Sequence, residues 1–207
     1  MTFVKICGIT NPEDALAAVA AGADSLGFNF YPASPRFIQP KPARQIIEEL
    51  PREVLTVGVF VNEKSPADVI RIVKDAGVNA IQLHGEESPD YCAALSDYFV
   101  IKALRVDSTF AVSSATAYAT SAIMLDGFDE QLRGGTGKVF DWSIARNVRN
   151  VVPKLFLAGG LSPENIVDAI AAVNPYAVDA CSALESIPGK KDLDRVEQFI
   201  RRARGGV

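Results

Sequence analysis

Short apolar runs alternate with helical segments along the whole chain, and this alternation restricts the fold more than any other feature. Runs rich in β-branched and aromatic residues predict eight strands, at 3–7, 25–30, 54–61, 79–83, 99–104, 122–126, 154–158 and 176–181. Nearly continuous apolar strands are typical of a parallel sheet covered on both faces. Because a helical segment follows each strand, we expect an α/β fold, a single (β/α)8 TIM barrel that forms one catalytic domain over residues 1–207. A doubly wound open sheet is the alternative.

Capping signals indicate where several helices start and end. An Asn or Ser directly before a proline predicts a helix start, because the side chain caps free N–H groups and proline fits the first helical position. These starts are Asn11-Pro12, Ser65-Pro66, Ser88-Pro89 and Ser162-Pro163. Gly22 and Gly77 are expected to end the first and third helices, and the last helix is predicted over about 192–204. The segment 108–118, rich in Ser, Thr and Ala, has the weakest helical pattern.

Charge and hydropathy limit the partners of the chain. Its 21 Lys and Arg stand against 25 Asp and Glu, a net charge of −4, which excludes a strongly basic nucleic-acid-binding surface. No apolar run reaches the length of a membrane span. The first predicted strand begins at residue 3, which leaves no room for a secretory signal. We therefore expect a cytoplasmic protein that binds neither nucleic acid nor membrane.

Cysteine and histidine are scarce. Three cysteines, at positions 7, 92 and 181, and the single His84 predict neither a disulfide framework nor a metal site. Catalysis would have to use carboxylates, thiols, lysines or backbone groups. His84 is either a ligand contact or a polar group satisfied by nearby backbone, and we favour the second.

Two reactive side chains stand where (β/α)8 barrels carry their active sites, at the C-terminal ends of strands. Cys7 ends the first strand and Asp126 the sixth. A thiolate at Cys7 could act as a base or nucleophile, although most free cysteines are small buried hydrophobic groups. Asp126 is either a structural carboxylate or an acid that donates a proton. Cys92 is expected to be buried in a helix, and the role of Cys181 stays open.

Glycine-rich loops suggest where an anion binds. Gly159 and Gly160 allow backbone N–H groups to approach a ligand, and a helix is predicted to start at Ser162-Pro163. Together with the loop after the eighth strand, this is a common phosphate site of barrels, although the glycines alone could make a tight turn. The sequence GGTGK at 134–138 lacks the spacing of a nucleotide-binding loop and predicts a mobile loop over the site. Arg36, in a long loop, is either a solvated charge or a bidentate ligand of a carboxylate.

Several motifs in order resemble the phosphoribosylanthranilate isomerase family, barrel enzymes of tryptophan biosynthesis. They are KICGIT, SPRFI, QLHGEE, LDG…GGTGKVFDW, LAGGLSPENI and VDACSALES…PGKKD, between residues 5 and 192. The resemblance implies an aldose–ketose isomerase, an intramolecular oxidoreductase without metal or organic cofactor. Its reaction is the Amadori rearrangement of N-(5-phosphoribosyl)anthranilate to 1-(2-carboxyphenylamino)-1-deoxyribulose 5-phosphate.

The resemblance also assigns roles to residues. It implies that Cys7 is the general base, that Asp126 is the general acid and that Arg36 binds the anthranilate carboxylate. It also implies that Asp179 lies beside the substrate. The phosphate is expected to bind to Gly159 and Gly160 and to Ser182 and Ala183. The sequence is compatible with a monomer or a homodimer.

The chain departs from the family pattern after the eighth strand. The family usually reads VDVSSGVE where this chain reads VDACSALE, so Cys181 replaces a serine and Ala183 a glycine. Phosphate binding by the Ala183 N–H requires a negative φ there, because a positive φ is costly for any residue with a Cβ.

Other sugar-phosphate barrels are rival interpretations. A metal-dependent ribulose-phosphate epimerase needs histidine ligands that His84 alone does not supply. The histidine-pathway isomerase has an aspartate where this chain has Cys7. A non-catalytic sensor of phosphorylated ligands would need neither Cys7 nor Asp126.

Overall fold

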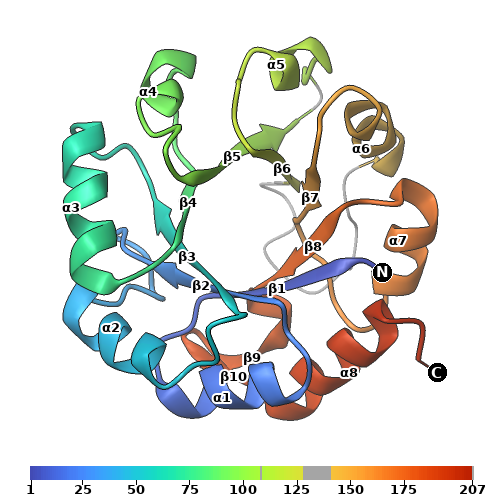
Figure 1. Cartoon of the computed structure of the whole chain (residues 1–207). Coiled ribbons are helices and arrows are strands. Elements are labelled where there is room, and N and C mark those ends of the chain that lie inside the picture. The colour runs from blue at the N-terminus through green and yellow to red at the C-terminus, as the bar shows by residue number, and fades with distance from the viewer. Residues whose placement is uncertain (108, 128–140, 207) are drawn as a thin grey trace.

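Eight parallel strands close into a barrel (Figure 1) in a computed structural model that describes residues 1–107, 109–127 and 141–206. The strands are β1 (Phe3–Cys7), β2 (Ser25–Asn29), β3 (Leu55–Phe60), β4 (Ala80–Leu83), β5 (Phe99–Val106), β6 (Ala122–Gly127), β7 (Leu155–Leu157) and β8 (Ala177–Ala180). Each strand pairs with the next, and β1 pairs with β8 through Lys5 and Asp179. This closing pair confirms the (β/α)8 barrel and excludes the open sheet.

Helices surround the barrel on its outer side (Figure 1). They are α1 (Pro12–Ala20), α2 (Pro40–Glu48), α3 (Pro66–Ala76), α4 (Pro89–Ala93), α5 (Ser113–Thr116), α6 (Trp142–Arg149), α7 (Ile166–Val173) and α8 (Leu193–Ala203). A short 3-10 helix, η1 (Ser182–Leu184), and an antiparallel pair, β9 (Glu185–Ile187) and β10 (Lys190–Lys191), follow β8. In the described part of the chain, no helix is long and apolar enough to cross a membrane.

Local capping explains most helix ends. The side chains of Asn11, Ser65 and Ser88 accept N–H bonds at the starts of α1, α3 and α4, as expected. Gly77 ends α3 with φ 75°, and Gly22 follows α1 by two residues. The predicted last helix is confirmed as α8. The segment 108–118 forms only the single turn α5, with residue 108 outside the described residues.

The predicted start of α7 is wrong. The helix begins at Ile166, after Asn165, and not at Ser162-Pro163. The Asn165 side chain instead accepts from Ser162 N at 2.9 Å and donates to the Gly160 carbonyl at 2.9 Å. These two hydrogen bonds hold the preceding segment as a turn.

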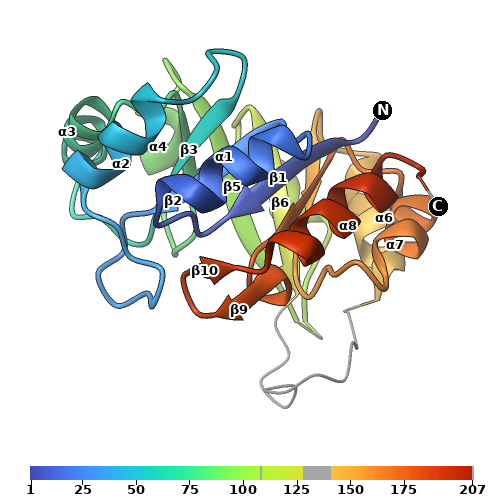
Figure 2. The same cartoon turned by 90° about the horizontal axis from the view of Figure 1, so that it is seen from below.

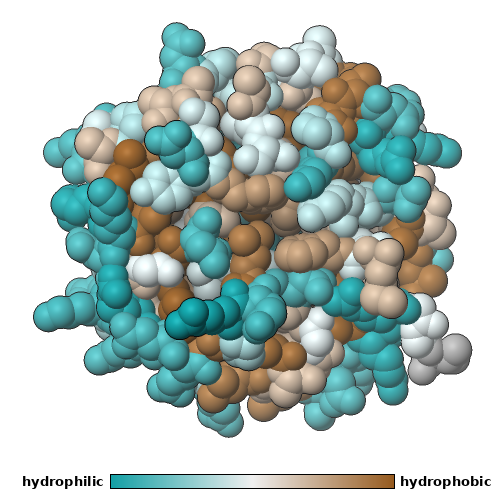
Figure 3. All heavy atoms as spheres, viewed as in Figure 1, coloured by the Kyte–Doolittle hydropathy of each residue, from teal (hydrophilic) through white to brown (hydrophobic). Residues whose placement is uncertain are grey.

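Apolar side chains close one end of the barrel. Inside, Phe156 and Met124 are fully buried, and Phe3 and Phe99 pack below them where the strands begin. The Phe3 ring stacks on Tyr176 with centroids 5.9 Å apart. Figure 3 views this end, with apolar residues toward its middle and hydrophilic residues along most of its rim. A polar site in the barrel therefore has to open at the opposite end.

Candidate active site

A cavity of about 260 Å³ opens at the C-terminal ends of the strands. Segments far apart in sequence extend from this end of the barrel, among them the loop between β2 and α2 and the β9–β10 hairpin (Figure 2). The cavity is lined by all the residues singled out in the sequence: Cys7, Arg36, Asp126, Gly159, Gly160, Asp179, Ser182 and Ala183. It is also lined by Asn29, Ser34 and Gln82, which the sequence had not singled out, and by His84 and Cys181, for which the sequence left more than one role open.

Lys5 is a buried cation beside Cys7 that the sequence reasoning missed. Its side chain is fully buried, and its Nζ lies 2.8 Å from Asp179 Oδ1. A Cβ built on Gly27 would lie 2.7 Å from the Cys7 sulfur and 3.1 Å from Lys5 Nζ. The ammonium and the thiol therefore occupy the same small space beside Gly27. The alternation of side chains along β1, which puts residues 5 and 7 on the same face, was the signal for it.

The surroundings of Cys7 favour its thiolate. A hydrogen bond from Cys181 is the largest effect and lowers the pKa of Cys7, while burial opposes it. The positive charges of Lys5 and Lys191 lower this pKa further, so that it lies well below the ordinary thiol value. A thiolate held in this way can accept a proton or attack an electrophile.

One ammonium serves two anionic groups. Burial by itself would lower the pKa of Lys5, but the charges of Asp179 and Cys7 raise it overall, so Lys5 stays protonated. Burial raises the pKa of Asp179 to about 7 although Lys5 opposes the shift, and the negative charges of Cys7 and Asp126 add to the rise. Asp179 and the Cys7 thiolate thus compete for the charge of Lys5.

His84 connects Asp126 to Gln82. His84 Nε2 lies 3.1 Å from Asp126 Oδ2, and His84 Nδ1 lies 2.8 Å from Gln82 Nε2. Burial lowers the pKa of His84, but the hydrogen bond and charge of Asp126 outweigh it and raise this pKa overall. The expectation that backbone satisfies this ring is wrong, because both ring nitrogens face side chains. The position of His84 directly after β4 was the available signal.

Arg36 is held by a carboxylate of the protein itself. Its Nε and Nη2 donate to Glu185 at 2.9 and 2.6 Å, and Glu185 also lies 3.2 Å from Lys191 Nζ. Burial would raise the pKa of Glu185, but Arg36 and Lys191 outweigh it and keep this carboxylate ionised. Since one edge of the guanidinium is committed to Glu185, a ligand carboxylate would have to use the edge formed by Nη1 and Nη2.

The glycine turn after β7 needs glycine. Gly159 and Gly160 have φ values of 82° and 70°. A Cβ on Gly159 would lie 2.2 Å from the backbone nitrogen of Gly127, so any side chain would collide with β6. The turn lines the cavity together with η1, whose first N–H groups have no carbonyl partner within the helix. Ala183 lies in η1, and the described non-glycine residues with positive φ are Asn62 and Asn174, which confirms the expected negative φ.

Arg195 on α8 joins the two loops that flank this part of the cavity. Its Nε donates to the Ala183 carbonyl at 2.7 Å, and its Nη2 donates to Glu164 at 3.0 Å. Ala183 follows β8 and Glu164 follows β7, so one side chain fixes the distance between the two loops. The segment 134–138, predicted to be a loop over the site, lies outside the described residues.

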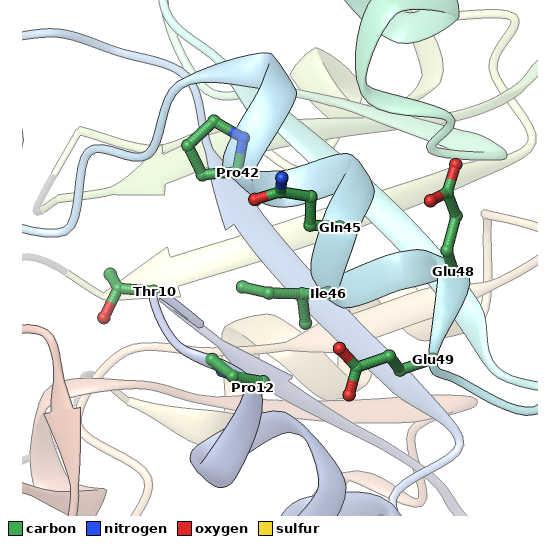
Figure 4. Close-up of a pocket in the computed structure, with 7 residues that line it drawn as sticks. All are labelled: Thr10, Pro12, Pro42, Gln45, Ile46, Glu48 and Glu49. Atoms are coloured by element: carbon green, nitrogen blue, oxygen red, sulfur yellow. The ribbon is translucent and has the colours of Figure 1, made fainter.

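A second cavity, of about 540 Å³, lies beside α2 (Figure 4). Thr10, before α1, and Pro12, at its start, line it on one side, and α2 with its C-terminal cap contributes Pro42, Gln45, Ile46, Glu48 and Glu49. Among the described residues of this lining, the charged groups are two carboxylates. This cavity is therefore poorly suited to an anionic ligand. The cavity with Cys7, by contrast, is lined by Arg36 and by two segments that can present backbone N–H groups, the glycine turn after β7 and η1.

Comparison with known families matches this arrangement to one of them. The family model described as N-(5'-phosphoribosyl)anthranilate (PRA) isomerase matches residues 4–202. The chain belongs to this family. The phosphoribosylanthranilate isomerase of Trichlorobacter lovleyi is 49% identical over 99% of this chain and 98% of its own length. The Thermotoga maritima isomerase is 47% identical over 99% of this chain and 100% of its own.

Solved structures of phosphoribosylanthranilate isomerases have the same fold. The crystal structure of the Thermotoga maritima enzyme superposes with a TM-score of 0.93 at 47% identity, covering 99% of this chain and 100% of that one. Another isomerase structure, in complex with reduced 1-(o-carboxyphenylamino)-1-deoxyribulose 5-phosphate, gives a TM-score of 0.89 at 45% identity, with coverages of 99% and 100%. A thiamine phosphate pyrophosphorylase also shares the fold, with a TM-score of 0.68, but at 14% identity this likeness concerns the fold alone.

Proposed function

We propose that the chain catalyses the Amadori rearrangement of N-(5-phosphoribosyl)anthranilate to 1-(2-carboxyphenylamino)-1-deoxyribulose 5-phosphate, the phosphoribosylanthranilate isomerase step of tryptophan biosynthesis. The observation that carries the proposal is one cavity lined by a thiol in a cationic environment, Cys7, and a carboxyl group paired with a histidine, Asp126. An acid and a base in one cavity are what a proton-transfer isomerisation needs. The names of the relatives support the same substrate.

In the first step, Asp126 acts as the general acid. It donates a proton to the ring oxygen of the ribose, the C1–O bond breaks, and the anilino nitrogen supplies the electron pair that forms an iminium ion. His84, 3.1 Å from Asp126, can share the proton with this carboxyl group before transfer and stabilise the carboxylate afterwards. Shared protons of this kind belong to the pair as a whole.

In the second step, Cys7 acts as the general base. The iminium ion makes the proton on C2 acidic, and the Cys7 thiolate removes it to leave an enolamine. The enolamine then tautomerises to the ketone product. Lys5 stabilises the thiolate before the transfer, and afterwards its charge remains paired with Asp179, 2.8 Å away. No step requires a metal or an organic cofactor.

The ends of the substrate have separate binding groups. We assign the phosphate to the N–H groups of Gly159, Gly160, Ser182 and Ala183, since glycine turns and helix starts bind anions. The anthranilate carboxylate goes to the free edge of Arg36, which Glu185 holds in place. We place Asp179 beside the ribose, where its ion pair with Lys5 holds the ammonium next to Cys7, the general base. Phosphate or sulfate soaked into crystals should lie between the two loops, and an anion bound elsewhere with this rim empty would reverse the substrate orientation.

The wider setting follows from the same proposal. We propose a single catalytic domain over residues 1–207 that acts in the cytoplasm on a small molecule, without nucleic-acid or membrane partners. The monomer and the homodimer both remain predictions. One related structure is described as monomers made from a dimeric Thermotoga maritima isomerase, which concerns that protein.

A fluorescence assay for loss of phosphoribosylanthranilate tests the activity. Cys7→Ser and Asp126→Asn each remove a proton-transfer group and should lower kcat by ~10²–10⁴-fold. Cys92→Ser, in α4 and remote from the cavity lining, is the matched control and should retain turnover. Circular dichroism should show that all variants fold. Binding of the substrate without turnover by the wild-type protein would indicate a sensor instead of an enzyme, and near-wild-type activity of Cys7→Ser would disprove the assigned base.

A further inference from the structure

Cys7 is the last residue of β1, and Cys181 directly follows the end of the paired strand β8. The register of β1 and β8 pairs Lys5 with Asp179 and Ile6 with Ala180, and the next residues along the two chains are these cysteines. The last paired residues, Ile6 and Ala180, belong to strands about 4.8 Å apart, a spacing within the Cα separations of about 4.4–6.8 Å found in disulfides, and each cysteine directly follows one of them. Lys5 and Asp179 meet through their side chains. Cys7 lies two residues after Lys5 in β1, so its side chain faces the same side as that of Lys5. Cys181 lies between β8 and η1, and its proximity to Cys7 comes from the contacts below.

The contacts of the two thiols agree with this register. Both line the cavity. The neighbouring Cys181 thiol is the largest cause of the lowered pKa of Cys7. A Cβ built on Gly8, the residue after Cys7, would lie 2.8 Å from the Cys181 sulfur. The Cys181 sulfur is also 3.9 Å from Lys191 Nζ, so a cation lies beside the thiol pair.

We infer that Cys7 and Cys181 form a site of reversible oxidative modification, at which a hydroperoxide joins them in an intramolecular disulfide. The Cys7 thiolate attacks the terminal peroxide oxygen and the O–O bond breaks. The other oxygen leaves as hydroxide from hydrogen peroxide, or as alkoxide from an organic hydroperoxide, and takes a proton from water. Cys7 is then a sulfenic acid. The Cys181 sulfur attacks the Cys7 sulfur, the S–O bond breaks, and the leaving hydroxide takes the Cys181 proton to form water. Two thiols are oxidised, and one hydroperoxide is reduced to water and, for an organic hydroperoxide, an alcohol.

The third cysteine lacks these properties. Cys92 is buried in α4, and burial raises its pKa to about 11. A protonated, buried thiol reacts slowly with peroxide. Cys92 therefore serves as the internal reference for the selectivity of the reaction.

Peptide mapping tests the modification directly. The protein is treated with hydrogen peroxide, remaining thiols are blocked with iodoacetamide, and trypsin is added without reduction. Each cysteine lies on a separate tryptic peptide: 6–36 for Cys7, 75–102 for Cys92 and 155–190 for Cys181. We expect a cross-linked species of peptides 6–36 and 155–190 from monomeric protein, with 75–102 recovered in its alkylated form. Dithiothreitol should separate the two peptides. Recovery of 6–36 and 155–190 only as separate peptides, or joined only between molecules, would overturn the inference.

Activity provides a second readout, which rests on the proposed function because the disulfide removes the assigned base. Wild-type and Cys92→Ser proteins should lose at least ~10-fold in kcat on oxidation and recover it with dithiothreitol. Cys181→Ser, compared with its own unoxidised sample, should lose activity that dithiothreitol does not restore after long exposure, because Cys7 proceeds to the sulfinic acid. Full recovery of Cys181→Ser under these conditions would contradict a protective role for the disulfide. A protein that forms the disulfide but shows no isomerase activity before oxidation would refute the proposed function and leave the modification site intact.

Discussion

Replacing Lys5 by methionine tests whether a buried ammonium keeps Cys7 ionised. Lys5 is fully buried, and its Nζ shares the space beside Gly27 with the Cys7 sulfur. Two unit charges about 5 Å apart attract each other by about 3 kcal/mol at an effective dielectric constant of about 20. Loss of this attraction should reduce the thiolate population about a hundredfold at a pH where the thiol form dominates.

The rate of Cys7 alkylation by iodoacetamide, followed by mass spectrometry between about pH 5 and pH 10, measures this population because only the thiolate reacts. The Lys5→Met profile should lie at higher pH than the wild-type profile, and kcat at neutral pH should fall in parallel. Lys41→Met, on the exposed side of α2, is the matched control and should leave the profile in place. An unchanged profile for Lys5→Met would refute the electrostatic argument.

Stability has to be separated from this effect. Removing Lys5 leaves Asp179 buried without its cation, and breaking a buried pair in this way costs about 3–5 kcal/mol. The double variant Lys5→Met/Asp179→Asn removes both charges and should unfold at a higher urea concentration than the single variant. It should still show the alkylation profile displaced to higher pH, since Cys7 has lost its cation in both proteins.

Four further predictions concern binding, pH and metals. Arg36→Met should raise KM more than it lowers kcat, because the guanidinium holds the substrate carboxylate in ground and transition states alike; an unchanged KM would make Arg36 purely structural. Arg195→Met should raise KM by loosening the two phosphate loops, whereas Arg201→Met on the same helix should not, and equal KM values in steady-state assays would exclude this role. The wild-type protein should lose stability to urea as the pH rises from about 4 to the Asp179 pKa of about 7, because the folded state binds this proton more tightly than the unfolded state; Asp179→Asn should remove this loss. If the loss persists in the variant, another group causes it. EDTA should leave activity unchanged, because the chain has one histidine and its described part has no metal-binding cluster; reversible loss restored by a divalent ion would contradict this.

The barrel could be predicted because its signals are local. Each strand is a short apolar run, and the predicted strands agree with the observed ones to within two residues at each end, as for 99–104 and β5 (Phe99–Val106). Caps such as Asn11 bond to N–H groups three residues away, so three of the four proline-marked starts are confirmed. The fourth failed because Asn165 bonds back to the preceding turn. The weak helical pattern of 108–118 corresponded to a single helical turn.

The residues of the candidate site also fall into those that the sequence predicted and those that it did not. Cys7, Asp126 and Gly159 could be selected from the sequence, because position at the end of a strand decides which side chains reach the active end of a barrel. The sequence held only indirect signals for the side chains that pair with them, such as the alternation that puts Lys5 on the same face as Cys7. In the sequence, Lys5 is one charged residue within an apolar strand. Only closure of the barrel brings it to Asp179, 174 residues away in sequence.

Burial is the physical reason for the difference. The order of apolar and polar residues determined the fold and the end of the barrel that carries the chemistry, since both follow from local pattern and chain connectivity. Protonation states depend on which charges share a space from which water is excluded, and only the closed barrel decides that. Arg36 is paired with Glu185 across 149 residues and His84 with Asp126 across 42, and Cys181, just after β8, acts on Cys7 at the end of β1. Each pairing changes the charge or reactivity of a side chain, and the sequence alone did not reveal the partner.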